Sequence, residues 1–325
     1  MYYAAACQTD FPAPKSRDEI ADRTRRMIEM IEQTVIGYRP FFDVRLFAFP
    51  EFAHAVPIFE TPAELAAKLA VELPNEHCDA YIKVAKKYGI YIQTGTFLEV
   101  DQRFPGAVFN STLLIGPGGV LARYRKINPW IPWEVHASPH DIENYPDDPF
   151  PVVDTELGKL GVAICYDWLF PETIRELAFR GAEVLIRVSA YMDPWGTAQP
   201  MDWWTTINRA RALENTSFVL AANQGAQMAH YPPFSWPGGS MAVDYDGRIL
   251  AQADPGPGEK VVVAPINIEA LRQERQRRQG HDTRAHLRSS MHRYAQREYL
   301  PPAAGSPISI DSLGARIAVG KERIS

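Results

Sequence analysis

The stretch KLGVAICYDWLFPETIRELAFRGAEVLIRVSA, residues 159–190, predicts a strand, a helix and a second strand in succession. Its first apolar run ends at Cys165, and Pro171 suits the first helical turn, where a backbone N–H has no partner inside the helix. Gly181 is placed to end that helix, and a second apolar run continues to Ala190. This order of elements is typical of a layered α/β fold.

The same alternation continues toward both ends of the chain. Apolar runs predict strands at residues 2–7, 44–51, 90–100, 108–116, 120–126 and 218–224. Helices are predicted at residues 18–38, 75–89 and 204–217. The turn signals Pro117-Gly118-Gly119 and Asp246-Gly247 predict two hairpins. Hairpins among strand–helix units indicate an α/β fold with a mixed sheet.

The composition is that of a globular protein with a large core. The chain has 325 residues, of which 46% are hydrophobic. A net charge of −5 argues against nucleic-acid binding, and no apolar run approaches the roughly 20 residues that span a bilayer. The first residues lack the basic and apolar regions of a secretion signal. We therefore expect neither a nucleic-acid nor a membrane partner.

The three cysteines, Cys7, Cys78 and Cys165, are too few and too far apart for a disulfide scaffold or a zinc site. Free thiols fit a reducing cytoplasm, which is where we expect the protein to be. Cys7 falls in a predicted strand and Cys78 on a predicted helix, so both are interpreted as structural. Cys165 is the cysteine whose setting suggests chemistry.

The character of the chain changes near residue 266. The segment LRQERQRRQGHDTRAHLR is rich in arginine, and the last residues have little core-forming periodicity. We therefore divide the chain into a core domain, residues 1–265, and a C-terminal arm, residues 266–325. The arm is interpreted either as a surface helix with a loosely held tail or as a segment that packs on a neighbouring subunit.

Cys165 ends an apolar strand just before a helix, and two interpretations are open. A cysteine in this place is commonly a small buried apolar residue. A strand-to-helix turn also presents a side chain at the carboxyl edge of a sheet, where backbone N–H groups stabilise a thiolate and later an oxyanion. A free thiol has a pKa of about 8.5, so attack near neutral pH requires a base or a cation nearby.

Three charged residues supply such groups. Glu51 follows the predicted strand in FAFPEF, and we expect it at the same sheet edge as Cys165, where ligands of α/β sheets bind. Lys126 ends the strand VLARYRK and precedes a loop whose Trp130 and Trp133 are placed to shield its ammonium from water. Glu134 lies eight residues beyond Lys126.

Four segments of this chain resemble the nitrilase superfamily of carbon–nitrogen hydrolases. They are FPEF (49–52), YRKINPWIPWE (124–134), GVAICYDWLFPE (161–172) and RARALENTSFVLAANQ (209–224). The resemblance runs from about residue 3 to about residue 265. It implies a four-layer α-β-β-α sandwich that pairs back to back in a homodimer or builds a larger homo-oligomer. It also implies that Glu51 is the general base, Lys126 the oxyanion stabiliser and Cys165 the nucleophile, with Glu134 completing the site.

The flanking residues favour one branch of this superfamily. The loop KINPWIPWE and the segment AEVLIRVSAYMDP, with Arg187, resemble aliphatic amidases and formamidases, whereas CYDWLFPE is closer to ω-amidases and Nit-like proteins. Carbamoylases of amino acids often carry arginines after the cysteine, and nitrilases often read Cys-Trp-Glu. This chain has Tyr166, Asp167 and Trp168 there, and we expect these three residues to help decide the substrate.

The resulting expectation is an amidase that hydrolyses a small carboxamide to an acid and ammonia through a thioester on Cys165, with no metal or organic cofactor. The substrate-contact candidates are Trp130, Tyr166, Tyr191 and Arg187. Further pocket candidates are Trp133, His136, Trp195 and Trp203. The alternatives are a nitrilase or an N-carbamoyl amine hydrolase on the same scaffold, and, more remotely, a binding or assembly protein without turnover.

Overall fold

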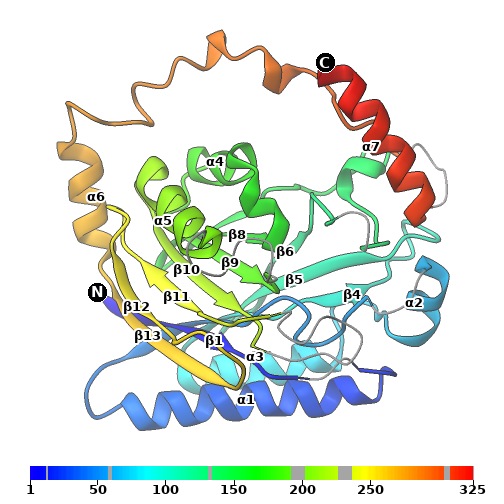
Figure 1. Ribbon diagram of the computed structural model, residues 1–325. Helices are drawn as coiled ribbons and strands as arrows, with labels where there is room; N and C mark the ends of the chain where they lie inside the picture. The colour runs from blue at the N-terminus through cyan, green and yellow to red at the C-terminus, as the bar shows by residue number, and fades with distance from the viewer. Residues whose placement is uncertain are drawn as a thin grey trace.

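The computed structural model describes residues 1–11, 14–57, 61–130, 134–191, 202–225, 236–303 and 308–324. Two mixed β-sheets pack face to face, and helices cover the outer face of each, as Figure 1 shows. The predicted four-layer α-β-β-α sandwich with mixed sheets is confirmed. Among the described residues, no helix combines the length and the apolar character that a membrane span requires.

The first sheet has the strand order β13-β1-β2-β3-β5-β4, and β6 also pairs with β5. Its strands are β1 (Tyr2–Gln8), β2 (Val44–Ala48), β3 (Tyr91–Gln93), β4 (Phe97–Glu99), β5 (Phe109–Gly116), β6 (Gly119–Arg125) and β13 (Lys260–Ile266). The pairs β1–β2 and β2–β3 are parallel, whereas β13, β4, β5 and β6 join the sheet in antiparallel pairs.

The second sheet has the order β12-β11-β10-β9-β8-β7. Its strands are β7 (Val152–Thr155), β8 (Gly158–Ile164), β9 (Val184–Ser189), β10 (Phe218–Asn223), β11 (Met241–Val243) and β12 (Ile249–Gln252). The three central strands β8, β9 and β10 are parallel, so their carboxyl ends lie at one edge.

Helices form the two outer layers and the C-terminal arm. Helices α1 (Glu19–Tyr38) and α3 (Glu76–Tyr88) cover the first sheet, and α4 (Pro171–Phe179) and α5 (Trp203–Asn215) cover the second (Figure 1). The remaining helices are α2 (Pro62–Lys68), α6 (Ile268–Arg277) and α7 (Ile310–Ile324).

The strand–helix–strand unit β8–α4–β9 forms as its sequence predicts. Pro171 begins α4, and Gly181 follows its end with a φ of 104°, a conformation that glycine adopts without a steric penalty. Ile174 and Leu177 bury the inner face of α4 in the core between this helix and the second sheet. The carboxyl end of β8 is thereby held in one place, and Cys165 follows it directly.

Alternating residues of β1 separate two cores. Ala4 and Ala6 face the second sheet, whereas Ala5 and Cys7 face the core under α1 and α3. Cys78, on α3, lies in that second core with Cys7. Small side chains on the inner face of β1 suit the close approach of the two sheets.

The predicted strand 90–100 is two strands, because Gly95 interrupts it. A Cβ atom at Gly95 would lie 2.4 Å from the Ala53 Cβ and 2.7 Å from the Pro50 carbonyl oxygen. The chain therefore turns between β3 and β4, and both segments pair with β5. This close approach holds the loop that carries Glu51 against the first sheet.

Strands β7 and β13 and helices α2 and α7 were not predicted from the sequence. Strand β13 pairs with β1 along all seven residues from Tyr2↔Ile266 to Gln8↔Lys260. The two helices at the end of the chain, α6 and α7, are anchored to the body by arginines. Arg275 of α6 donates to the carbonyls of Thr216 and Ala182, both at 2.8 Å, and Arg316 of α7 pairs with Asp141. The division of the chain at residue 265 stays a prediction.

The buried carboxylate of Asp167 ties the two sheets together. It follows β8, and its Oδ2 accepts from the Tyr124 hydroxyl of β6 at 2.7 Å and from the Ile164 N–H at 3.0 Å. Its Oδ1 accepts from the backbone N–H of Asn128 at 2.7 Å and from the Asn128 side chain at 3.0 Å. Burial raises the pKa of Asp167 to about 6, against the opposing effects of Lys126 and these donors.

We predict that Asp167→Asn destabilises the protein. Each Asp167 oxygen accepts from one backbone N–H, that of Ile164 or that of Asn128, so either orientation of an amide would set its NH₂ group against a backbone donor. The expected loss is roughly 2–3 kcal/mol in the free energy of unfolding, measured by urea denaturation. Asp154→Asn on the exposed face of β7 is the control and should change stability little. If the two variants had the same free energy of unfolding, the proposed role of Asp167 in linking the two sheets would be contradicted.

Candidate active site

Cys165 lies in a strained turn at the carboxyl end of β8. It is the first residue of a 3₁₀ turn, Cys165–Leu169, and has a φ of 46°, in the left-handed region that side chains disfavour. Such strain persists where the surrounding structure enforces it, and it is frequent at functional sites. The residue is 8% exposed, so the sulfur is nearly enclosed.

Glu51 reaches Cys165 from the other sheet. Its Oε1 accepts from Lys126 Nζ and Asn110 Nδ2, both at 2.8 Å, and its Oε2 accepts from the Ala190 backbone N–H at 3.0 Å. Burial raises the pKa of Glu51, and the neighbouring Lys126 and Cys165 oppose this rise. Glu51 is fully buried, and the contact with Ala190 shows that the carboxyl ends of β2 and β9 meet here.

The expectation that Glu51 and Cys165 share one sheet edge is wrong. Glu51 follows β2 of the first sheet, whereas Cys165 follows β8 of the second. They meet because the sheets stack with the carboxyl ends of these strands on the same side. Gln224, beyond β10, strengthens this junction, since its Nε2 donates to the Glu51 carbonyl at 3.0 Å.

Lys126 is fully buried between two carboxylates. Its Nζ lies 2.8 Å from Glu51 Oε1, 2.8 Å from Glu134 Oε1 and 2.7 Å from Glu134 Oε2. Burial alone disfavours the charged amine, but Glu134 and then Glu51 outweigh it and raise the pKa of Lys126 above its ordinary value. Lys126 is therefore a fixed ammonium in a dry site, where its electrostatic effect is strong.

The two glutamates bonded to Lys126 have different protonation behaviour. Burial raises the pKa of Glu51, and Lys126 only partly opposes this. Burial also works to raise the pKa of Glu134, but Lys126 and then His136 outweigh it and lower the pKa to about 2. The contacts explain the difference, because Glu134 has both oxygens on Lys126 and also accepts from the Trp130 backbone N–H at 2.6 Å. Glu51 is thus suited to carry a proton, and Glu134 stays ionised.

His136 supports Glu134 and does not line the pocket. Its Nε2 lies 3.2 Å from Glu134 Oε2, and the ring is 1% exposed. The sequence analysis offered His136 only as a pocket candidate and did not single out Asn110, although both contact the glutamates. The sequence signals these two residues only by their positions: His136 follows Glu134 by two residues, and Asn110 is the second residue of β5, the strand that pairs with β6.

A pocket of about 310 Å³ opens at Cys165. It is lined by Trp130, Cys165, Tyr166, Leu169, Ala190, Tyr191 and Trp203. The substrate-contact candidates Trp130, Tyr166 and Tyr191 are therefore beside the cysteine, and Trp203 joins them. Trp133 and Trp195 lie outside the described residues, so their placement is not described.

Two of the residues expected to help decide the substrate do not face this pocket. Asp167 forms the hydrogen bonds that link the two sheets. Trp168 is buried in the core, where its Nε1 donates to the Ala163 carbonyl at 3.1 Å. Both are fully buried because the turn after Cys165 points them into the protein. Only Tyr166 of the three lines the pocket.

Arg187 is buried behind the pocket and acts on it through charge. Its guanidinium carbon lies 4.3 Å from the Trp204 ring centroid and 4.9 Å from that of Tyr191. Its Nη1 donates to Asn208 at 2.8 Å, while Nε and Nη2 have no hydrogen-bond partner in the described part of the chain. Burial, and then Glu51, raise the pKa of the Cys165 thiol, whereas Lys126 and Arg187 act to lower it.

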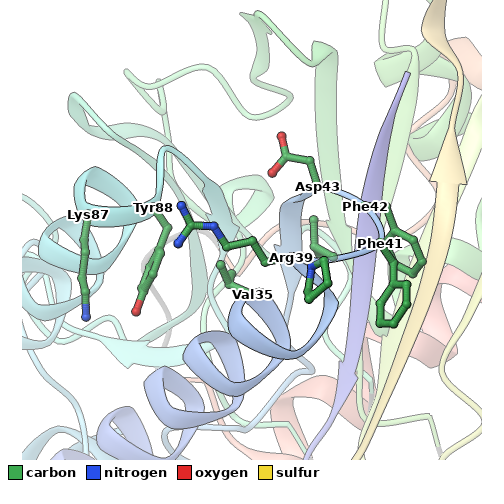
Figure 2. Close-up of a pocket in the computed structure, with 9 residues that line it drawn as sticks. Val35, Arg39, Phe41, Phe42, Asp43, Lys87 and Tyr88 are labelled. Atoms are coloured by element: carbon green, nitrogen blue, oxygen red, sulfur yellow. The ribbon is translucent and has the colours of Figure 1, made fainter.

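A larger cavity of about 540 Å³ lies at the opposite end of the first sheet (Figure 2). Asp43 and Val44 line it at the start of β2, whereas Glu51 lies beyond the end of that strand. Its Lys87 is paired with Glu32 at 2.8 Å. None of the candidate catalytic residues lines this cavity. Across the described segments, His, Cys, Asp and Glu form no group of three or more that could hold a metal ion.

Comparison with known proteins agrees with the fold. The family model described as carbon-nitrogen hydrolase matches residues 3–276. A formamidase of Bacillus cereus (strain Q1) is 31% identical over 279 residues, covering 84% of this chain and 76% of the relative. A formamidase of Bacillus thuringiensis (strain Al Hakam) is 30% identical over the same length and coverage.

The solved structures of other superfamily members share the fold. Saccharomyces cerevisiae Nit3, a member of branch 10 of the nitrilase superfamily, has a TM-score of 0.68 and 24% identity, covering 85% of this chain and 93% of Nit3. A carbon-nitrogen hydrolase of Helicobacter pylori G27 has a TM-score of 0.70 and 21% identity, covering 91% and 98%. This chain belongs to the carbon–nitrogen hydrolase family of the nitrilase superfamily, and it is a hydrolase acting on carbon–nitrogen bonds.

We predict that Glu134→Gln shifts the reactivity of Cys165 to lower pH. The negative charge of Glu134 raises the pKa of the Cys165 thiol and of Glu51, so its removal lowers both. Loss of Glu134 also frees Lys126 to stabilise the thiolate, which acts in the same direction. The measurement is the rate of Cys165 alkylation by iodoacetamide against pH, with the modified cysteine identified by mass spectrometry.

Glu143→Gln, at an exposed position nine residues beyond Glu134, is the matched control and should leave the profile unchanged. A Glu134→Gln profile that stays in place or moves to higher pH would contradict the assigned electrostatics.

Proposed function

We propose that the protein is an amidase that hydrolyses a small carboxamide to a carboxylic acid and ammonia through a thioester on Cys165. The observation that carries this proposal is the buried Lys126 ammonium, which bridges Glu51 and Glu134 beside a cysteine that opens into a pocket. The named activity of the two formamidase relatives supports an amide as the substrate.

The first half-reaction forms the thioester. Glu51 takes the thiol proton, and the sulfur of Cys165 bonds to the amide carbonyl carbon. The carbonyl oxygen becomes an oxyanion, which Lys126 Nζ and the backbone N–H of Tyr166 stabilise. A donor in such a site is typically worth about 2.7–4 kcal/mol. Glu51 then returns the proton to the nitrogen, the carbon–nitrogen bond breaks and ammonia leaves.

The second half-reaction releases the acid. Glu51 takes a proton from a water molecule, whose oxygen bonds to the thioester carbon. Lys126 and the Tyr166 N–H stabilise the second oxyanion, the carbon–sulfur bond breaks, and the proton passes from Glu51 to the sulfur. Amide and water are thereby converted to acid and ammonia. Glu134 stays ionised, holds Lys126 in place and orients the substrate amide.

The substrate contacts follow from the pocket. We assign Trp130, Tyr166 and Tyr191 to direct contact, since they line it with Cys165. Arg187 contributes through its charge, because it is fully buried beside Tyr191.

We also propose that the protein works in the cytoplasm as a homodimer or a larger homo-oligomer. Three free cysteines support the reducing compartment. Exposed apolar residues on the outer helices support association, namely Phe179 on α4, which is 49% exposed, and Leu213 on α5, which is 52% exposed. Residues 266–325 would then contribute to subunit packing.

We predict that Cys165→Ala abolishes turnover. Ammonia release is measured on a panel of short aliphatic amides, aryl amides, nitriles and carbamoyl compounds, and the expected loss is roughly a thousandfold or more. Cys78→Ala, a buried cysteine distant from the pocket, is the control and should remain active. During turnover, hydroxylamine should trap the acyl group as a hydroxamate.

Different results would contradict different parts of the proposal. Full activity of Cys165→Ala would remove the nucleophile assignment. Turnover of nitriles alone would identify a nitrilase, and turnover of carbamoyl compounds alone would identify an N-carbamoyl amine hydrolase.

A further inference from the structure

We propose that the preferred amide carries a bulky, uncharged apolar acyl group of the size of an aromatic ring, rather than the single hydrogen of formamide. This inference rests on the proposed amidase function and concerns the substrate class of the same site. It is carried by the lining, the volume and the charge of the pocket at Cys165.

Aromatic rings dominate the pocket lining. Trp130, Tyr166, Tyr191 and Trp203 contribute four rings, and Leu169 adds an aliphatic side chain. No charged side chain occurs among the described residues that line it. The volume of about 310 Å³ lies at the small end of the range of small-molecule pockets, which begins near 300 Å³. Formamide would leave most of this apolar surface without a partner, whereas a ring would bury it.

The pocket faces the acyl group and not the leaving group. Cys165 lines the pocket, so the acyl group bonded to its sulfur stays there through both half-reactions, whereas ammonia leaves after the first. Contacts between the pocket and the acyl substituent are therefore present in the transition states of both half-reactions.

Two of these rings are packed in fixed positions. Tyr166 meets Phe170 edge to face, with ring centroids 5.2 Å apart and an interplanar angle of 88°. Tyr191 lies 6.0 Å from Trp204. The edge-to-face arrangement of Tyr166 and Phe170 is favourable, and Tyr191 is also held by the Arg187 guanidinium, so this part of the pocket is formed before the substrate binds. Trp203, at the first position of α5, is 44% exposed and is therefore available at the rim.

The charge behind the pocket excludes a cationic acyl group. A group of aromatic rings would by itself suit a quaternary ammonium. Here Tyr191 already has the Arg187 guanidinium 4.9 Å from its ring centroid, and no ion pair joins Arg187 to a carboxylate in the described part of the chain. The positive charge of Arg187 opposes a second cation. An anionic group is disfavoured as well: Arg187 attracts it, but none of the described residues that line the pocket carries a charge that could contact it and offset its desolvation.

The experiment compares ammonia release from five amides by the full chain. Phenylacetamide tests the ring, formamide and acetamide test small acyl groups, betaine amide tests a cationic group and succinamate tests an anionic group. The expected kcat/KM for phenylacetamide exceeds that for acetamide at least tenfold, with the two charged amides below phenylacetamide.

The outcomes separate this inference from the amidase proposal. If formamide or acetamide has the highest kcat/KM, the substrate class is overturned and the amidase function stands. A charged amide as the best substrate also overturns the inference. If no amide releases ammonia, the amidase function itself fails.

Variants of Trp203 test whether the pocket causes the preference. Trp203→Ala should lower kcat/KM for phenylacetamide roughly tenfold and change that for acetamide less than about twofold, whereas Trp203→Phe should keep most of the preference. Thr206→Ala, an exposed position on the same helix, is the control and should leave the ratio of the two values unchanged. An equal loss on both amides in Trp203→Ala would show a general structural role and overturn the inference.

Discussion

The buried ammonium of Lys126 is the constraint on which the site depends. A charge that is taken out of water is costly unless partners surround it, and here two carboxylates, Glu51 and Glu134, lie within 2.8 Å of its Nζ. Glu51 follows β2, whereas Lys126 and Glu134 both lie in the loop after β6, so this one contact requires the first sheet, that loop and the turn after β2 to be in place together. Cys165 then comes from the second sheet. The chemistry is therefore possible only when both layers are assembled.

The unequal surroundings of the two glutamates give them different roles. Glu134 is held by Lys126, by a backbone N–H and by His136, so it stays ionised. Glu51 has only one oxygen on Lys126 and, among the described residues, no histidine bonded to it, and it is fully buried, which favours proton uptake. Outside this cluster, Asp167 fixes the turn that carries the nucleophile to β6, the strand that ends just before Lys126. A single buried carboxylate thus links the turn that carries the nucleophile to the strand and loop that carry the cation.

Sequence reasoning worked best where local signals were strong. The unit β8–α4–β9 follows from apolar runs bounded by Pro171 and Gly181, and the catalytic candidates followed from charged residues at predicted strand ends. Predictions from the sequence failed where contacts between residues far apart in the chain determine the structure. Gly95 breaks a predicted strand because of Ala53 and Pro50, and Asp167 was expected to help decide the substrate although it ties the two sheets together.

By itself the sequence determined the α/β class, the order of most elements, the family resemblance and the identity of Glu51, Lys126, Glu134 and Cys165 as candidates. These depend on periodicity, turn residues and motifs, all of which are local along the chain. Only the tertiary structure decided that Glu51 and Cys165 belong to different sheets and that Arg187 lies behind the pocket. It also decided that the two glutamates differ in pKa. Those facts depend on burial and on contacts between residues far apart in sequence, such as the 139 positions between Glu51 and Ala190.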